Sequence, residues 1–254
     1  MTRFVLLSTQ RSGSTWVVDS LNSHPRVVAY SELFMHGSEG RPKWGGERGL
    51  VYWRTFLEEK GSPRSRLVRA YWLWRYLGRA YASQPGVDAA GFKLMYSQLR
   101  VSRPLLPVLV LRRVRIIHLI RRNALDILLS KEAGAARGGT LHARSTDAVQ
   151  TVQLRLPTEG LLERIASHER EVARARARFS RLGLAYREVA YEDLVRDEER
   201  EFASLFGFLR VGPANGAVSS SLRKVNPTSH EELIENYDEV RTALEGTRFA
   251  PHLR

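Results

Sequence analysis

The chain has no cysteine among its 254 residues, which excludes disulfide bonds, thiolate metal sites and a cysteine nucleophile. It also has no uninterrupted run of eighteen apolar residues, so we expect no membrane-spanning helix and no stable membrane insertion. Met1-Thr2-Arg3 leads directly into an apolar segment, and we therefore expect no signal peptide. Together these absences predict a soluble, cytoplasmic protein.

Lysine is scarce, because only five of the 40 basic residues are lysine and the others are arginine. Against 27 acidic residues they produce a formal net charge of +13. A G+C-rich coding sequence accounts for much of the arginine content, and attraction to an anionic ligand such as a phosphorylated cofactor is a second cause. Helix-turn-helix, zinc and RNA-binding signatures are missing, so the charge alone does not predict a nucleic-acid partner.

Short apolar segments alternate with segments of helical periodicity along the chain. Strands are predicted at residues 4–8, 27–30, 90–95, 115–120 and 184–189. Helices are predicted at residues 15–21, 49–84, 103–113, 123–134, 158–182, 197–209 and 229–244. This alternation predicts an α/β fold in which a P-loop-like parallel sheet carries helices on both faces.

The length and the 43% of apolar residues suit a single domain over residues 1–254. Within it, an aromatic-rich helical insertion is predicted at about residues 47–84 and a flexible loop at about residues 134–156. Asn123 is expected to cap the helix that it precedes, and Ser229 to cap the last helix.

A phosphate-binding layout follows the first predicted strand, where the sequence reads Thr9-Gln10-Arg11-Ser12-Gly13-Ser14-Thr15-Trp16. In such a layout a turn of small residues joins a strand to a helix. The backbone N–H groups of the turn and the N-terminus of the helix then point at one anion. Gly13 permits close approach of the backbone, and Arg11 supplies a cation. Hydroxyl donors come from Ser12, Ser14 and Thr15.

This loop differs from a nucleoside-triphosphate loop, whose pattern is G-x-x-x-x-G-K-[ST]. Ser14 occupies the position of the lysine, and Ser8 occupies the position of the first glycine. The loop can therefore hold a phosphate or sulfate group, but it lacks the lysine that binds β- and γ-phosphates.

A second set of anion-binding residues follows the strand predicted at 115–120. Arg122 and Ser130 are eight positions apart, across a strand end and two helical turns, so both can reach one anion. Lys224 in a later basic loop is a further candidate. Two such sites predict a ligand with two separated phosphate groups, which the arginine fork grips well.

Three features allow two interpretations. Lys93 within a predicted strand either faces a site or reaches solvent from the edge of the sheet. His118 lies in an apolar strand and is expected to be a core residue and not a ligand. The aromatic residues within 49–84 are expected to form core, and the alternative is that some line an acceptor pocket.

Four motifs in order resemble the sulfotransferases that depend on 3′-phosphoadenosine-5′-phosphosulfate (PAPS). The segment 9–16 resembles the family's 5′-phosphosulfate loop, and the segment from Ile117 to Ser130 resembles its 3′-phosphate motif. Tyr191-Glu192-Asp193-Leu194 resembles the turn near adenine. Lys224-Val225-Asn226-Pro227-Thr228, followed by Glu235-Asn236-Tyr237, resembles the C-terminal segment of bacterial members. The resemblance covers nearly the whole chain.

The resemblance also suggests a branch of the family. Many cytosolic members have lysine where Arg11 stands, and arginine there is similar to the bacterial branch that includes trehalose-type sulfotransferases. In that branch the proposed base is a glutamate just after the second strand, and Glu32 matches it. Other branches use a histidine as base, and no histidine of this sequence has an equivalent position.

The function implied by the resemblance is in-line transfer of a sulfuryl group from PAPS to a hydroxyl of a small-molecule, sugar or lipid acceptor. It implies Glu32 and Arg11 as catalytic residues and 3′,5′-ADP as the product. The cofactor-binding residues that it implies are Arg11, Ser12, Gly13, Ser14, Thr15, Arg122, Ser130, Tyr191, Lys224 and Asn226. No metal is expected, because arginine and N–H groups would take the place of Mg²⁺.

Two other functions stay open at this point. A P-loop kinase or phosphotransferase is disfavoured by the missing lysine after Gly13. A non-catalytic protein that binds anions or nucleic acid is favoured only by the net charge. The sequence does not identify the acceptor or the oligomeric state, and a homo-oligomer is compatible with it.

Overall fold

The computed structural model describes residues 1–35, 50–100, 104–137, 143–144, 152–213, 218, 220, 222–223 and 229–253. The chain divides into two compact units. The first consists of Met1–Ile120 and Ala175–Ser219, and the second of Arg121–Arg174 and Ser220–Arg254. The expectation of a single domain over residues 1–254 stays a prediction.

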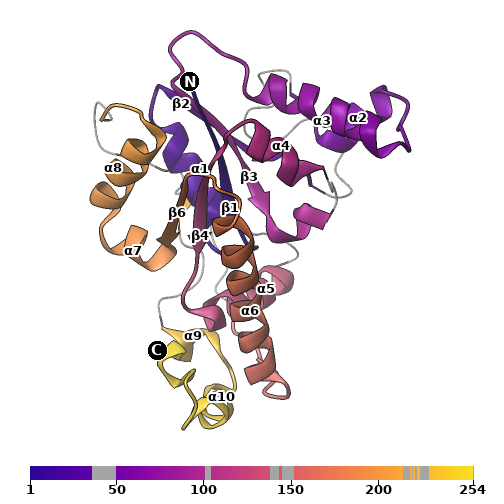
Figure 1. Ribbon diagram of the computed structural model, residues 1–254. Helices are drawn as coiled ribbons and strands as arrows, with labels where there is room; N and C mark the ends of the chain where they lie inside the picture. The colour runs from indigo at the N-terminus through magenta and orange to yellow at the C-terminus, as the bar shows by residue number, and fades with distance from the viewer. Residues whose placement is uncertain are drawn as a thin grey trace. The chain divides into compact units, whose positions relative to one another are not determined.

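A five-stranded parallel sheet forms the middle of the first unit, with the strand order β2–β3–β1–β4–β6 (Figure 1). The strands are β1 (Thr2–Ser8), β2 (Val27–Glu32), β3 (Ala89–Met95), β4 (Arg115–Ile120) and β6 (Tyr186–Ala190). β1 lies in the centre, and its residues from Phe4 to Ser8 are fully buried. The chain turns to opposite sides of the sheet around β1, so the segment after β1 lies where α/β sheets bind ligands.

Helices cover both faces of this sheet, as predicted. The helices of the first unit are α1 (Ser14–Asn22), α2 (Trp53–Glu59), α3 (Arg66–Ala80), α4 (Leu105–Leu111), α7 (Tyr191–Arg196), α8 (Glu198–Leu209) and, from Ala175 onward, the end of α6 (Leu161–Ser180). A short 3₁₀ helix, η2 (Tyr96–Arg100), follows β3.

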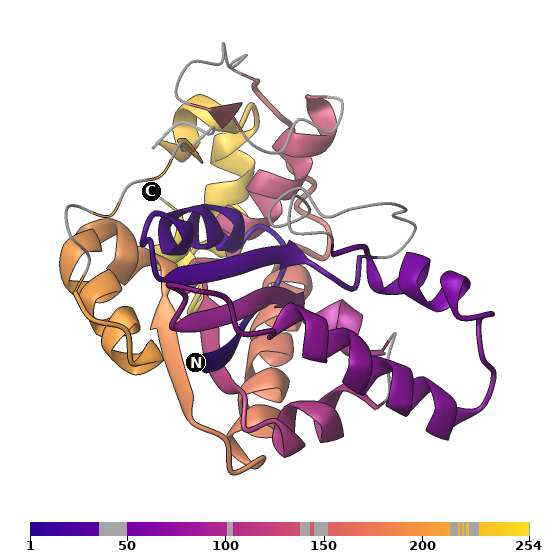
Figure 2. The same cartoon turned by 90° about the horizontal axis from the view of Figure 1, so that it is seen from above.

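Side chains that alternate along β1 explain the two layers. Phe4 and Leu6 pack with α1, α7 and α8, whereas Val5 and Leu7 pack with α2, α3, α4 and the end of α6. The view from above shows α1 and α8 on one side of the sheet and α3 and α4 on the other (Figure 2). The prediction of a parallel α/β fold is therefore confirmed.

The aromatic residues of α2 and α3 belong mainly to the core. Trp53, Phe56 and Tyr76 are buried within one cluster, and the ring centroids of Phe56 and Tyr76 are 5.1 Å apart. Tyr71 and Trp74 differ, because they lie exposed on the outer side of α3. The structure thus favours the core interpretation for most of this segment.

A chain of polar contacts runs through His118, which is a fully buried core residue on β4. Its Nε2 contacts the hydroxyl of Tyr96, and its Nδ1 lies 2.5 Å from the hydroxyl of Tyr186. The Tyr186 hydroxyl donates in turn to Glu188, 3.3 Å away, which Arg176 holds with two hydrogen bonds. Burial lowers the pKa of His118 to about 4, although the Glu188 charge acts in the opposite direction.

The second unit has its own small core. Its elements are α5 (Ala124–Ala136), α6 as far as Arg174, the antiparallel pair β5 (Ala143–Arg144) and β7 (Leu222–Arg223), α9 (His230–Leu233), α10 (Tyr237–Leu244) and the 3₁₀ helix η3 (Ala250–His252). Leu125, Ile165 and Val240 are among its fully buried residues. A buried hydrogen bond joins Nε2 of His230 to Oδ1 of Asp126 at 2.6 Å.

Asn123 caps α5, as predicted. Its side-chain oxygen accepts the backbone N–H of Asp126 at 3.2 Å. Its amide group also donates to the carbonyl of His252 at 2.7 Å, which fastens the end of the chain to the start of this helix. α5 extends to Ala136 and so includes the first residues of the loop predicted at 134–156.

Two predictions for the C-terminal region were wrong. The single helix predicted at 229–244 is divided into α9 and α10, and Ser229 makes no capping hydrogen bond from its side chain. The physical reason is Asn236, whose amide bonds to both the N–H and the carbonyl of Leu156, at 2.9 and 3.1 Å. A backbone bridge between Leu154 and Ile234 adds to this non-helical pairing.

Candidate active site

The loop between β1 and α1 has an unusual backbone conformation at two residues. Arg11 and Gly13 both have left-handed conformations, with φ of 64° and 85°. A non-glycine residue such as Arg11 pays roughly 1–3 kcal/mol for this conformation, and such strain is typical of functional loops. Gly13 is the N-cap of α1 and has no side chain to bond the first N–H groups of that helix. The turn and the helix start therefore present N–H donors for an anion.

The hydroxyl groups of the loop are used in different ways. Ser12 is fully buried, and its Oγ donates to the carbonyl of Thr9 at 2.8 Å. This hydrogen bond stabilises the turn. It also occupies the Ser12 hydroxyl, which the sequence predicted as a donor to a ligand. Thr15 is nearly buried as well and accepts a hydrogen bond from Lys93 at 3.1 Å.

Tyr191 lies against Gly13. A Cβ atom built on Gly13 would collide with the ring of Tyr191, so this position excludes a side chain for a second reason besides its φ. The same ring packs edge-on to Trp16 with centroids 5.8 Å apart. Tyr191 begins α7 directly after β6, and the structure thus brings this predicted residue to the loop.

Lys93 connects the loop to the predicted base. Its Nζ lies 3.0 Å from Oε1 of Glu32 as well as 3.1 Å from Oγ1 of Thr15. The side chains of Lys93 and Glu32 are only 7% and 16% exposed. The second carboxylate oxygen of Glu32 accepts a hydrogen bond from Gln98 at 2.6 Å. Of the two interpretations of Lys93, the structure supports the one in which it faces a site.

An irregularity in the sheet makes this contact. β2 and β3 are in regular register up to Tyr30 and Phe92, and then Glu32, not Ser31, lies opposite Lys93. Two residues of β2 thus correspond to one of β3, as in a β-bulge, which changes the direction of the following side chain. Glu32 and Lys93 become direct neighbours at the carboxyl edge of the sheet.

Tyr52 and Gln98 are two site residues that the sequence did not single out. Burial, and then the charge of Glu32, raise the pKa of Tyr52, which places its hydroxyl in the field of that carboxylate. Gln98 is buried in η2, donates to Glu32 and accepts the N–H of Met95 at 3.1 Å. No sequence motif identifies either residue. Gln98 belongs to the site because it contacts Glu32, and Tyr52 because the charge of Glu32 contributes to its raised pKa.

The predicted 3′-phosphate residues belong to the second unit. Arg122 lies exposed between β4 and the N-cap of α5, and Ser130 is half-buried on α5. Lys224 and Asn226 lie outside the described residues. The structure therefore brings together Thr15, Glu32 and Lys93. It also places Tyr191 against Gly13 of the loop. A common site with Arg122 and Ser130 stays a prediction.

Two searches of the described residues concern other classes of site. No group of three or more histidine, aspartate or glutamate residues there could hold a metal ion. In that same part of the chain, no helix combines the length and the apolar character required to cross a membrane.

Comparison with known proteins places this chain in a family. The chain resembles the solved sulfotransferase of Alicyclobacillus acidocaldarius with a TM-score of 0.50 and 14% identity, over 99% of this chain and 92% of that one. It also resembles the sulfotransferase domain of the Synechococcus PCC 7002 olefin synthase, with 21% identity, a TM-score of 0.43 and coverage of 83% and 73%. No curated protein matches the chain. The family model described as "Sulfotransferase domain" matches residues 1–226, and this chain therefore belongs to the sulfotransferase domain family.

Proposed function

We propose that the protein transfers a sulfuryl group from PAPS to a hydroxyl group of a small-molecule acceptor. Family membership supports sulfuryl transfer in general. The observation that carries the finer proposal is the buried Lys93, whose ammonium group joins Thr15 of the loop to the carboxylate of Glu32. An anion-binding loop, a cation and a potential base thus adjoin one another at the carboxyl edge of the sheet.

The chemistry of the loop fits a phosphosulfate group. Arg11 and Lys93 are cations, and the turn at Gly13 adds N–H donors at the start of α1. When bound, PAPS supplies an activated sulfuryl group on a phosphate leaving group. Arg11, Ser14, Thr15 and Lys93 would stabilise the negative charge that develops there.

Glu32 would accept the proton of the acceptor hydroxyl. A positioned base contributes roughly 10²- to 10⁴-fold to a rate. Lys93 and Gln98 each hold one oxygen of this carboxylate, so they would fix its direction toward the acceptor.

The remaining predicted residues would select the nucleotide. Arg122 and Ser130, with Lys224 and Asn226, would bind the 3′-phosphate and so distinguish PAPS from ATP. Tyr191, which already packs against the loop, would lie beside adenine. These assignments rest on the motif resemblance, and binding measurements with single variants test them.

The first experiment is calorimetric titration with 3′,5′-ADP and with ATP in the absence of metal. We expect saturable binding of 3′,5′-ADP and much weaker binding of ATP. Arg122→Ala should abolish the preference, whereas Arg155→Ala, an exposed arginine of the second unit that pairs with Glu239, should leave it intact. A parallel titration of ATP with Mg²⁺ that gave tighter binding than 3′,5′-ADP would instead support a kinase and contradict the proposal.

The second experiment tests the base with ³⁵S-labelled PAPS and a panel of sugar, lipid and phenolic alcohols. Glu32→Gln should lose about 10²- to 10⁴-fold in turnover and keep its affinity for 3′,5′-ADP. Glu58→Gln removes an exposed carboxylate on α2 and is the matched control. An equal loss of turnover and of 3′,5′-ADP affinity in Glu32→Gln would contradict the role of Glu32 as base.

A further inference from the structure

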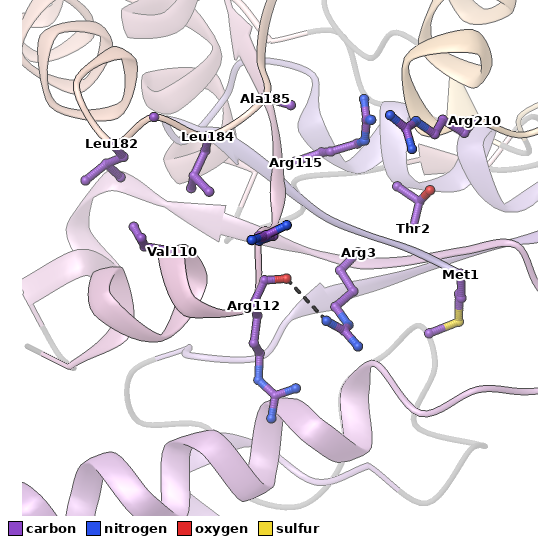
Figure 3. A pocket seen from close by; sticks show the side chains of 12 residues that line it. Met1, Thr2, Arg3, Val110, Arg112, Arg115, Leu182, Leu184, Ala185 and Arg210 are labelled. Atoms are coloured by element: carbon purple, nitrogen blue, oxygen red, sulfur yellow. Dashed lines mark hydrogen bonds between the residues drawn. The ribbon is translucent and has the colours of Figure 1, made fainter.

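A pocket of about 760 Å³ lies in the first unit (Figure 3). It lies at the amino ends of the strands, whereas the loop follows the carboxyl end of β1. Thr2 at the start of β1 and Arg115 at the start of β4 both line it. Strands rise about 3.3 Å per residue, so the seven residues of β1 separate this pocket from the loop at Thr9 by roughly 20 Å. The pocket shares no residue with the site of the proposed function.

The charge of this pocket is one-sided. Its lining includes Arg3, Arg112, Arg113, Arg115 and Arg210, and it contains no aspartate or glutamate. Within the described part of the chain, none of these five arginines forms an ion pair with a carboxylate. The lining of this concave surface thus contributes five positively charged residues and no opposing charge.

Neutral partners hold several of these arginines in place. Arg3 donates to the carbonyl of Arg112 at 3.3 Å, and Arg115 donates to the carbonyl of Phe208 at 2.8 Å. The guanidinium of Arg112 lies 3.9 Å from the ring centroid of Trp74, and its buried Nε has no hydrogen-bond partner. The charged groups are therefore ordered before any ligand arrives, which lowers the entropic cost of binding.

Mutual repulsion within the cluster adds to the effect of burial on the pKa values of two of its arginines. Burial, and then the neighbouring charge of Arg3, lower the pKa of Arg112. Burial, and then the charge of Arg210, lower the pKa of Arg115. The nearby carboxylate of Asp88 does not relieve this repulsion, because it pairs with Arg26 at 2.6 Å. An anion within the pocket would relieve it.

The pocket also has an apolar side. Figure 3 shows Val110, Leu182 and Leu184 on one side, and Arg115 and Arg210 together on the other. Its volume lies within the range of sites for small organic ligands, roughly 300–1,000 Å³. A concave pocket with two unlike sides suits a compact ligand that has an anionic part and an apolar part.

We propose that this pocket is a second, non-catalytic binding site for a ligand that carries two or more phosphate or sulfate groups. Guanidinium groups bind such groups through paired hydrogen bonds, and five of them exceed what a single charge requires. The same chemistry occurs in free polyphosphorylated molecules and in phospholipid headgroups, and the experiment distinguishes these two sources.

The test uses the full chain already saturated with 3′,5′-ADP, or without it if that ligand does not bind, so the outcome is independent of the proposed function. Tripolyphosphate is titrated into the protein by calorimetry at constant ionic strength. In a parallel arm, the protein is sedimented with phosphatidylcholine vesicles that contain or lack cardiolipin, a phospholipid whose headgroup carries two phosphate groups. We expect saturable binding of one equivalent of tripolyphosphate, or sedimentation only with the anionic vesicles if the source is a headgroup.

The variants replace exposed arginines, so that folding is preserved. Arg113→Gln combined with Arg210→Gln should weaken binding at least about tenfold, because charge-assisted hydrogen bonds are lost. Arg174→Gln combined with Arg178→Gln removes the same charge from the exposed face of α6 and should leave binding unchanged. Thermal unfolding of both pairs verifies that they are folded.

Three outcomes would overturn the proposal. The first is the absence of saturable binding in both arms. The second is equal weakening by the two pairs of variants, which would show a general effect of net charge. The third is an effect of Arg113→Gln with Arg210→Gln on binding of duplex DNA alone, which would identify a nucleic-acid surface in place of a pocket for a small ligand.

Discussion

The Nζ atom of Lys93 lies between two groups of the site, 3.0 Å from Oε1 of Glu32 and 3.1 Å from Oγ1 of Thr15. These three residues come from β3, β2 and α1, and the parallel sheet brings them to one edge. Because both charged side chains are largely buried, the attraction between them must compensate for the water that each has lost. The pair therefore has consequences for stability as well as for the proposed catalysis.

The first prediction concerns the energy of this pair. Lys93→Met should destabilise the protein by about 3 kcal/mol, because it leaves the carboxylate of Glu32 largely buried without its cation. The double variant Lys93→Met with Glu32→Gln should recover part of this loss, and urea unfolding measures it. The exposed pair Arg54–Glu58 is the control, and its coupling should stay below about 1 kcal/mol. Strictly additive losses at Lys93 and Glu32 would show that the pair is not coupled.

The second prediction concerns the glycine of the loop. Gly13→Ala should cost about 1–3 kcal/mol of stability and weaken binding of 3′,5′-ADP, because the new methyl group meets Tyr191 and the left-handed backbone is strained. Adding Tyr191→Ala should relieve the steric part of the loss in stability and leave the backbone part. Gly207→Ala on α8 is the control, because no atom lies near its Cβ position, and it should stabilise the helix by about 0.5–1 kcal/mol. The explanation fails if Gly13→Ala is as harmless as Gly207→Ala.

The third prediction concerns pH and the buried His118. The folded-state pKa of about 4 lies below the usual value of 6.5, so the folded protein holds this imidazole neutral. Between pH 6.5 and about 4 the unfolded chain binds a proton there and the folded chain does not. Stability from this residue is thus complete above pH 6.5 and decreases as the pH falls, by up to about 1.4 kcal/mol per pH unit.

Chemical denaturation across this pH range, compared between the wild type and His118→Gln, measures the effect. Subtracting the two curves removes the contribution of groups that titrate equally in both proteins. We expect the stability difference to shrink as the pH falls from 6.5 to about 4. A difference that stays constant with pH would show that burial does not depress the pKa of His118.

The fourth prediction compares two residues that the sequence identified as helix caps. Asn123→Ala should cost about 1–2 kcal/mol, because the cap on the N–H of Asp126 and the bond to the carbonyl of His252 are both lost. Ser229→Ala should change stability by less than about 0.5 kcal/mol, since its side chain makes no capping bond. Thermal or urea unfolding of the two variants decides between equal and unequal effects, and equal effects would contradict the geometry.

Local rules of the chain were sufficient for the elements around the site. The apolar run of β1 is fully buried, and the small residues after it form the turn that precedes α1. Asn123 caps α5 because capping depends only on a few neighbouring backbone groups. The alternation of strands and helices is also a local pattern, and it predicted a parallel sheet with two layers of helices. Four motifs in order indicated the family.

Residues distant in the sequence were beyond such rules. Nothing local in the sequence shows that a register irregularity after Tyr30 places Glu32 beside Lys93, or that Gln98 bonds the same carboxylate. Asn236 interrupts the last predicted helix through bonds to Leu156, eighty positions earlier. The arginines that line the pocket come from the starts of β1 and β4 and the ends of α4 and α8.

The sequence by itself thus determined the type of fold, and it predicted an anion-binding loop and a candidate base. The tertiary structure decided which side chains meet there, because contact between strands depends on register and packing across the whole sheet. It also decided that Lys93 contacts Glu32 and that five arginines line one pocket at the amino ends of the strands. Periodicity is a property of neighbouring residues, whereas a site is a property of residues that only folding brings together.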